Sequence, residues 1–148
     1  MSEQVTLEQM ELAVQEIMEA FDVDQPPVPI ELMLERPRDG LWPRADLAEL
    51  TSSFLVMTDR YSPRMSVARL LARHIARSDW GVEHGLEPVF HSKNLINTFA
   101  RVLMMPRRMV EHALESGQSE VALINRFEVP ENDYMFRLED LGFRTQEK

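Results

Sequence analysis

Helix start and stop signals recur through the second half of this chain, and they constrain its fold more than any other feature. Ser62-Pro63 places a serine at the helix cap and a proline at the first helical position. Further starts follow at Pro106, Ser119 and Pro130. Between these signals the apolar residues recur at steps of three and four, which is typical of amphipathic helices. The pattern predicts helices over 62–78, 93–105, 106–117, 119–127 and 130–142.

The first quarter of the chain is acidic. Residues 1–35 hold nine Asp and Glu and no Lys or Arg, so they carry the whole net charge of −9. An apolar stripe that ends at Phe21 predicts an amphipathic helix, and Thr6 is its expected cap. We therefore expect an acidic amphipathic helix within 1–25 and a single domain over 26–148 that ends in a helical hairpin.

Residues 53–58, which read SFLVMT, are the best candidate for a strand, because they are apolar and partly β-branched. Residues 79–92 contain two glycines and a proline, and we expect them to be irregular. Helices outnumber strands in this reading. The expected fold is α+β, with a mostly helical domain around a small β-sheet.

Composition excludes several functional classes. The chain has no cysteine, which rules out disulfides, cysteine nucleophiles and thiolate metal sites. The spacing of its five glycines fits no phosphate-binding loop. No apolar run approaches the roughly 20 residues of a membrane span, and no secretory leader is visible. We therefore expect a cytoplasmic protein without a membrane partner, and the net acidity argues against nucleic acid as a partner.

Four segments, in series, match one known family. They are PPVPIELML at 26–34, SFLVMTDRYSPRMSVARLLARHIAR at 53–77, NTFARVLMMP at 97–106 and LINRFEVPENDYMFRLEDLGF at 123–143. Together they resemble the ImmA/IrrE family of zinc metallopeptidases. The resemblance implies a compact zincin-like domain of prokaryotic origin. It also implies a role in transcription regulation and stress response, because active members cleave or bind helix-turn-helix repressors.

The active helix of that family carries Ala-His-Glu-Leu-Gly-His, in which two histidines bind zinc and the glutamate is the general base. The resemblance puts Arg73 and Arg77 at the two histidine positions and His74 at the glutamate position. Lys93 falls where the family has a further acidic ligand. An arginine has no lone pair for a metal. We therefore expect no catalytic residues, no bound metal and no other cofactor.

The same alignment implies a basic cleft in place of the metal site. Its expected residues are Arg69, Arg73, Arg77, Lys93 and Asn97. These cations would pair with carboxylates, including those of the acidic N-terminal helix, or bind an anion. The alternative is an ordinary solvated helix face, because the three arginines follow one another at four-residue steps.

Two other functions stay open. One is a zinc peptidase with relocated ligands. Its candidate ligands are His74, His84 and His91, with Glu83 or Glu87 beside them. The other is a DNA-binding regulator that acts through residues 119–142, which have the rhythm of a helix-turn-helix module. Acids outnumber arginines in 120–144, however, and this favours a hairpin that closes the core.

The main prediction is a catalytically inactive, metallopeptidase-like protein that acts as a regulatory or protein-interaction module. Its expected partner is a protein or a peptide, and a helix-turn-helix repressor is the partner that the resemblance implies. A homodimer is a further candidate. Metal analysis separates this prediction from the peptidase, and a salt-dependent DNA shift assay separates it from the DNA-binding regulator.

Overall fold

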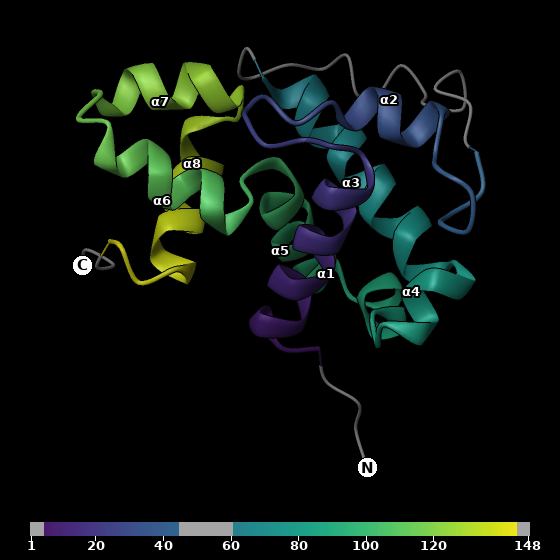
Figure 1. The fold of residues 1–148 in the computed structure, drawn as a ribbon. Coiled ribbons are helices and arrows are strands. Elements are labelled where there is room, and N and C mark those ends of the chain that lie inside the picture. The colour runs from purple at the N-terminus through teal and green to yellow at the C-terminus, as the bar shows by residue number, and fades with distance from the viewer. Residues whose placement is uncertain (1–4, 45–60, 145–148) are drawn as a thin grey trace.

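The computed structural model describes residues 5–44 and 61–144 (Figure 1). All regular structure within these residues is helical. The elements are α1 (Leu7–Ala20), α2 (Ile30–Glu35), α3 (Ser62–Arg77), α4 (Asp79–Glu83), the 3-10 helix η3 (Glu87–His91), α5 (Lys93–Met104), α6 (Arg107–Glu115), α7 (Glu120–Phe127) and α8 (Glu131–Asp140). None of these helices is long and apolar enough to cross a bilayer.

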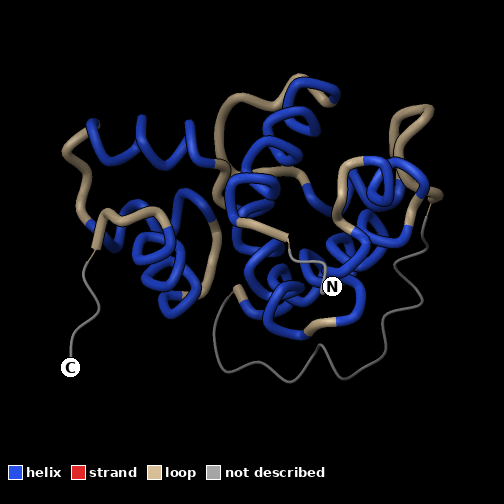
Figure 2. The backbone as a smooth tube through the Cα atoms, turned by 90° about the horizontal axis from the view of Figure 1, so that it is seen from below, coloured by secondary structure: helices blue, strands red, loops and turns tan. Residues whose placement is uncertain are grey.

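The expected α+β fold, with a zincin-like domain around a small sheet, is wrong. The part of the chain that the structure describes contains no strand, and Figure 2 shows helices and loops there. The candidate strand at 53–58 lies outside the described residues. The described core does not depend on a sheet, because α1, α2, α3 and α5 fill it with their own apolar faces.

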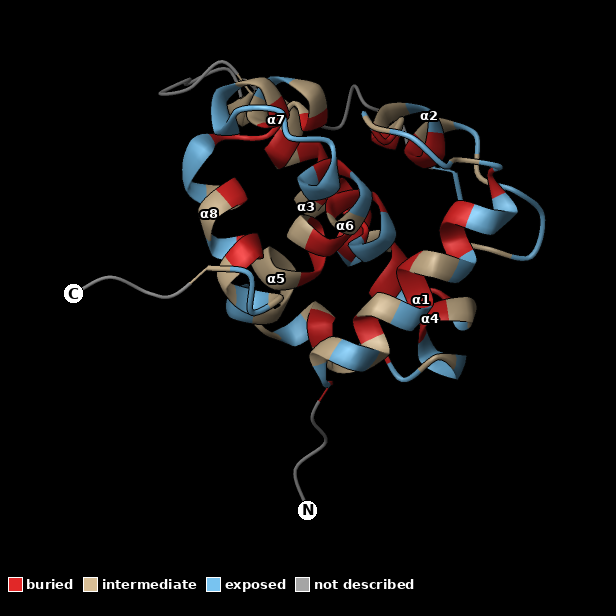
Figure 3. Cartoon of the chain, turned by 60° about the vertical axis from the view of Figure 1, so that its left-hand side comes forward, coloured by how far each residue is buried: buried red, intermediate tan, exposed pale blue. Residues whose placement is uncertain are grey.

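The centre of the molecule is the contact between α3 and α5. The helices α2 and η3 pack against α3, while α1 and α8 each pack on α5. The inward side chains include Leu71, Ala72 and Ile75 on α3, and Phe99 and Leu103 on α5; all are fully buried. Buried residues gather where the helices face one another (Figure 3). The helix that carries Arg73 and the helix that carries Lys93, both assigned to the predicted cleft, are therefore in contact.

Most helix starts that the sequence predicts are confirmed. The Thr6 hydroxyl accepts a bond from the Gln9 amide at 3.1 Å, and the two residues form a reciprocal capping box at the start of α1. The Ser119 hydroxyl accepts a bond from the Ala122 amide, also at 3.1 Å, at the start of α7. The helix predicted from Ser62-Pro63 begins at Ser62, but its cap is Tyr61 and no side chain bonds there, so the prediction that Ser62 is the cap is wrong. Local capping chemistry is thus sufficient to place the starts of α1 and α7.

Residues 79–92, expected to be irregular, contain α4 and η3. The Ser78 hydroxyl caps α4 by accepting a bond from the Gly81 amide at 3.0 Å. Gly81 lies so close to the end of α3 that a Cβ atom there would be 1.9 Å from the carbonyl oxygen of Ile75. Because Gly81 has no side chain, α4 can therefore begin directly against the end of α3, where the glycine in the sequence predicts only irregular structure.

The last three helices, α6, α7 and α8, form a group on one side of α5, and α2, α3 and α4 lie on the other side (Figure 1). Three arginines join this group to the rest of the molecule. Their ion pairs are Arg64–Glu128 at 3.1 Å, Arg101–Asp140 at 3.5 Å and Arg137–Glu11 at 2.6 Å. The relative position of the two sides is therefore held by charge pairs as well as by the packing of α8 on α5.

Candidate functional site

Arg73 and Arg77, two residues of the predicted basic cleft, are exposed on α3. Their guanidinium carbons lie 5.7 and 5.9 Å from the centre of the Phe90 ring, so both cations stack on one aromatic side chain. Neither arginine forms an ion pair with any residue that the structure describes. The structure brings these two residues together, on an exposed face.

The other residues of the predicted cleft lie apart from this pair. Arg69 is half-buried, donates a hydrogen bond to the Ser66 hydroxyl at 3.1 Å, and lines a hollow beside the start of α8. Lys93 is exposed at the first position of α5, and Asn97 is half-buried one turn later. The proximity of α3 and α5 thus does not gather all five side chains into one described pocket.

The acidic residues of α1 pair with partners other than the α3 arginines. Glu11 pairs with Arg137, and Glu16 lies 3.1 Å from the Nε2 atom of His84. The His84 ring also stacks on Trp80, with ring centres 3.8 Å apart. These contacts attach α1 to α8 and to α4. The expectation that the N-terminal acids serve as partners for the cleft arginines has no support among the described contacts.

The three histidines of the alternative zinc site each have a separate neighbour. The Nδ1 atom of His74 is 3.2 Å from the Leu70 carbonyl oxygen, that of His84 is 2.7 Å from the Trp80 carbonyl oxygen, and the Nε2 atom of His91 is 3.1 Å from Glu87. No three His, Asp or Glu side chains within the described residues form a group suited to a metal ion. The structure does not assemble the relocated ligand set.

The helices α7 and α8 have the order of a helix-turn-helix module, but α8 offers little to DNA. Its one basic residue, Arg137, is completely buried. The acids Glu131 and Asp140 are exposed on it. Arg144, which follows α8, is bound to Glu120 at 3.2 Å, and Arg126 lies on α7 and not on the would-be recognition helix. A recognition helix that exposes acids and buries its only base would repel phosphates.

A groove lies between α1 and α6, and none of the sequence predictions includes it. Its volume is about 810 Å³. The helix α1 and the residues 23–26 that follow it line one part, and Pro106, α6 and Arg126 line the other. A groove of this size between helices is a common position for a ligand.

The groove has apolar surface open to solvent. Leu12 lines it and is 63% exposed, the second most exposed of the large apolar side chains described. Leu7 and Val23 add half-buried apolar area, and Met18 and Met109 contribute buried side chains to the lining. In the sequence, Leu12 falls outside the inward stripe of α1, and this unused apolar position is the one sequence feature that marks the groove. An exposed leucine in a concave surface marks a place where burial by a partner is favourable.

The two sides of the groove carry opposite charges. Glu8, Glu11 and Glu19 lie on the α1 side, together with Asp24. The other side carries basic residues. These are Arg107, Arg108 and Arg126, with His112 among them and Glu111 as an acidic exception. Arg107 is paired with Glu111 on its own helix at 3.0 Å.

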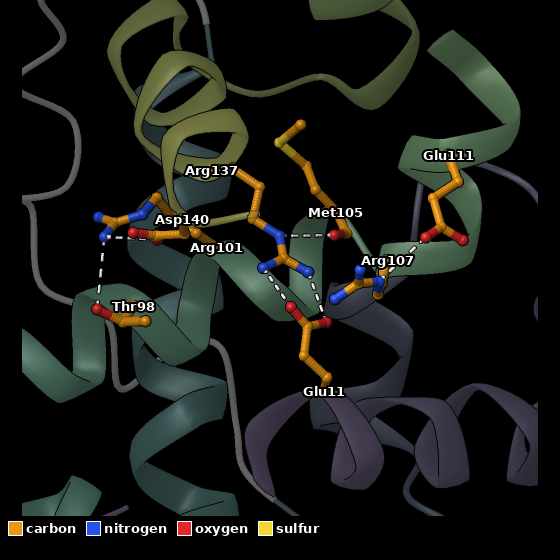
Figure 4. A network of polar contacts seen from close by, with 8 residues as sticks. All are labelled: Glu11, Thr98, Arg101, Met105, Arg107, Glu111, Arg137 and Asp140. Atoms are coloured by element: carbon orange, nitrogen blue, oxygen red, sulfur yellow. Dashed lines mark hydrogen bonds and ion pairs between the residues drawn. The ribbon is translucent and has the colours of Figure 1, made fainter. Parts of the chain in front are cut away.

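A buried charge pair holds the α1 side in position (Figure 4). The guanidinium of Arg137 donates to both carboxylate oxygens of Glu11, at 2.6 and 2.7 Å, and its Nε donates to the Met105 carbonyl oxygen at 2.9 Å. The Arg137 side chain is fully buried, and that of Glu11 is 11% exposed. Because Met105 lies two residues before α6, this one arginine links α1, α8 and the segment that leads into α6.

The scan of protein-family models, the search of curated proteins and the search of solved structures each find no match to this chain. The resemblance of 26–143 to the ImmA/IrrE family therefore stays a prediction. The groove between α1 and α6 is the described feature that bears most directly on function.

Proposed function

We propose that this protein is a non-catalytic regulatory or protein-interaction module, and that it binds a helical segment of a partner in the groove between α1 and α6. The observation that carries the proposal is the exposed side chain of Leu12 within a groove of about 810 Å³. A groove between two helices accommodates a third helix, whose apolar face buries the exposed side chains. A helix of a helix-turn-helix repressor, the partner class implied by the family resemblance, has the required shape.

Two further observations support a protein partner over the alternatives. The burial of Arg137 leaves α8 with exposed acids, which favours protein over DNA. Arg73 and Arg77, at the positions where the resemblance expects zinc ligands, cannot donate a lone pair to a metal. These residue types favour a binding function, with the family's peptidase chemistry lost from this chain.

The test uses a panel of fluorescently labelled helical peptides that share one leucine stripe and differ in their flanking charges. We expect at least one of them to bind the full chain, as measured by fluorescence anisotropy. Leu12→Glu would weaken binding by roughly tenfold or more, because it places a charge in the apolar contact. Leu32→Glu is the matched control, since Leu32 is 48% exposed and lies outside the groove lining. The proposal is wrong if no peptide binds, or if the two variants weaken binding equally.

A further inference from the structure

The charged residues along the groove fall into two groups, those in a described ion pair and those in none. Glu11 and Arg107 belong to the first group, because Arg137 and Glu111 neutralise them. The second group forms no ion pair with the described residues and lines the groove from both sides. It comprises Glu8, Glu19 and Asp24 on the α1 side, and Arg108 and Arg126 on the other side. No described ion pair joins two lining residues on opposite sides of the groove.

Opposite charges that face a groove without reaching each other are solvated by water as long as the groove is empty. An occupant that displaces this water must replace its hydrogen bonds, or the charged groups lose solvation without compensation. An apolar occupant would bury the exposed Leu12 side chain but would leave the charged residues on both sides of the groove without ion-pair partners. An occupant with one charge sign would satisfy one side and repel the other.

From this arrangement we infer that the occupant is an amphipathic helix with a basic edge on one side of its apolar stripe and an acidic edge on the other. The inference rests on the proposed function and names its partner by chemistry. The basic edge lies along Glu8 and Glu19 of α1, and the acidic edge lies along Arg108 and Arg126. The apolar stripe between the edges covers Leu12. The helix α1 has 14 residues and is therefore about 21 Å long, so a helix of three to four turns matches it.

The charge arrangement also fixes the direction in which the helix lies. A helix turned end over end in the groove keeps its apolar stripe against Leu12 but exchanges its two edges. The exchanged edges would place acid against Glu8 and base against Arg108. A given sequence is therefore bound in one direction only, and a peptide with its two edges interchanged is bound in the opposite direction.

Four peptides with the same leucine stripe test the inference. One has a basic and an acidic edge, the second has these edges interchanged, the third has two acidic edges and the fourth two basic edges. We expect both split-edge peptides to bind the full chain about tenfold more tightly than either uniform peptide at low ionic strength. The difference shrinks in high salt, where the charges are screened.

Direction is read from a spin label at the N-terminus of each split-edge peptide. We expect the first peptide to broaden amide resonances near one end of α1, and the interchanged peptide to broaden those near the other end. Glu8→Lys combined with Glu19→Lys makes both sides basic, and this variant should prefer the peptide with two acidic edges. Leu32→Glu is the control variant, and it should keep the original ranking.

The outcomes separate the two claims. If peptides bind in a Leu12-dependent manner but all four bind equally, the charge-split inference is wrong and the groove remains a docking site. The inference is also wrong if both split-edge peptides lie in the same direction. If no peptide binds, the proposed function itself is wrong. Self-association of the protein alone that Leu12→Glu abolishes in sedimentation would make a second copy the occupant, and it would overturn the inference.

Discussion

The guanidinium of Arg137 on α8 donates two hydrogen bonds to the carboxylate of Glu11 on α1, with N–O distances of 2.6 and 2.7 Å. The two residues are 126 positions apart in the sequence. A bidentate arginine–carboxylate pair specifies orientation as well as distance, because both groups are planar. The pair therefore sets how α1 lies relative to α8, and with it the geometry of the groove that α1 lines.

Removing one member of this pair should be costly. The Glu11 side chain is only 11% exposed, and Arg137→Met removes its charge partner, so we expect the free energy of unfolding to fall by about 3–5 kcal/mol. The matched control is Arg107→Met, which breaks an exposed pair with Glu111 and should cost about 1 kcal/mol or less. Urea denaturation of both variants provides the comparison, and equal losses would contradict the structural role of Arg137.

The double variant Glu11→Leu, Arg137→Met adds a second check on the pair. It leaves no charge stranded, so it should be more stable than Arg137→Met alone. A double variant whose loss equals the sum of the two single losses would show that the two side chains do not act as a pair.

The contact between α3 and α4 predicts an unusual sensitivity at Gly81. Gly81→Ala would place a Cβ atom 1.9 Å from the Ile75 carbonyl oxygen, and α4 would have to move away; we expect a loss of about 3 kcal/mol or more. Gly117→Ala is the control. Nothing lies within 4 Å of a Cβ atom there, and the cost is the strain of a φ of +78°, about 1 kcal/mol. Thermal melts should rank the two variants in that order; the reverse order would argue against the close approach of α4.

Local chemistry in the sequence was sufficient to predict most helices. Ser119 and Thr6 cap helices through bonds to residues three positions away, so their effect is contained in a short segment. Gly81 shows the limit of this reasoning. Its role depends on the close approach of a neighbouring helix. In the sequence alone, a glycine at this position predicts only an interruption of helical structure. The small sheet was predicted from one apolar segment and from the family resemblance. The described helices bury their apolar faces against one another, so they form a core without a sheet.

The candidate site was harder to predict than the fold. The groove exists because α1 and α6 lie opposite each other, and residues about 100 positions apart in sequence supply its two sides. Arg137 belongs to a segment used for the family resemblance, yet nothing in its neighbourhood indicates Glu11 as its partner. The predicted cleft was based on the spacing of residues along one helix. That spacing shows which residues share a face of the helix, but it does not show that Arg73 and Arg77 stack on Phe90 at an exposed face.

Stability at alkaline pH should depend on Tyr134. Burial raises the pKa of its hydroxyl above the usual 10.0, nearby Glu120 raises it further, and Arg144 lowers it. The folded protein therefore keeps this proton at a pH where the unfolded chain releases it. Stability is fully present below the unfolded pKa, and it falls as the pH rises from there toward the folded pKa. Tyr134→Phe should remove this part of the pH dependence, which urea denaturation across pH 9–11 measures as a difference between the two proteins; identical slopes would contradict the pKa direction.

The exposed arginines of α3 lead to a prediction about metal. Because guanidinium groups occupy the positions where the resemblance places zinc ligands, we expect the purified protein to hold no stoichiometric zinc and its melting temperature to be unchanged by a chelator. Elemental analysis together with melts in the presence of EDTA checks both. About one zinc per chain, lost on chelation together with stability, would support the relocated-ligand peptidase instead.

The most direct test of the docking account is methyl NMR of the methionines during titration with a split-edge helical peptide. Met18 and Met109 line the groove, one on each side, whereas Met33 and Met65 are buried and do not line it. We predict that the methyl resonances of Met18 and Met109 shift together with one affinity, and that those of Met33 and Met65 stay in place. Shifts at Met65, which lies beside Arg69, with none at Met18 and Met109 would contradict the account and direct attention back to the basic face of α3.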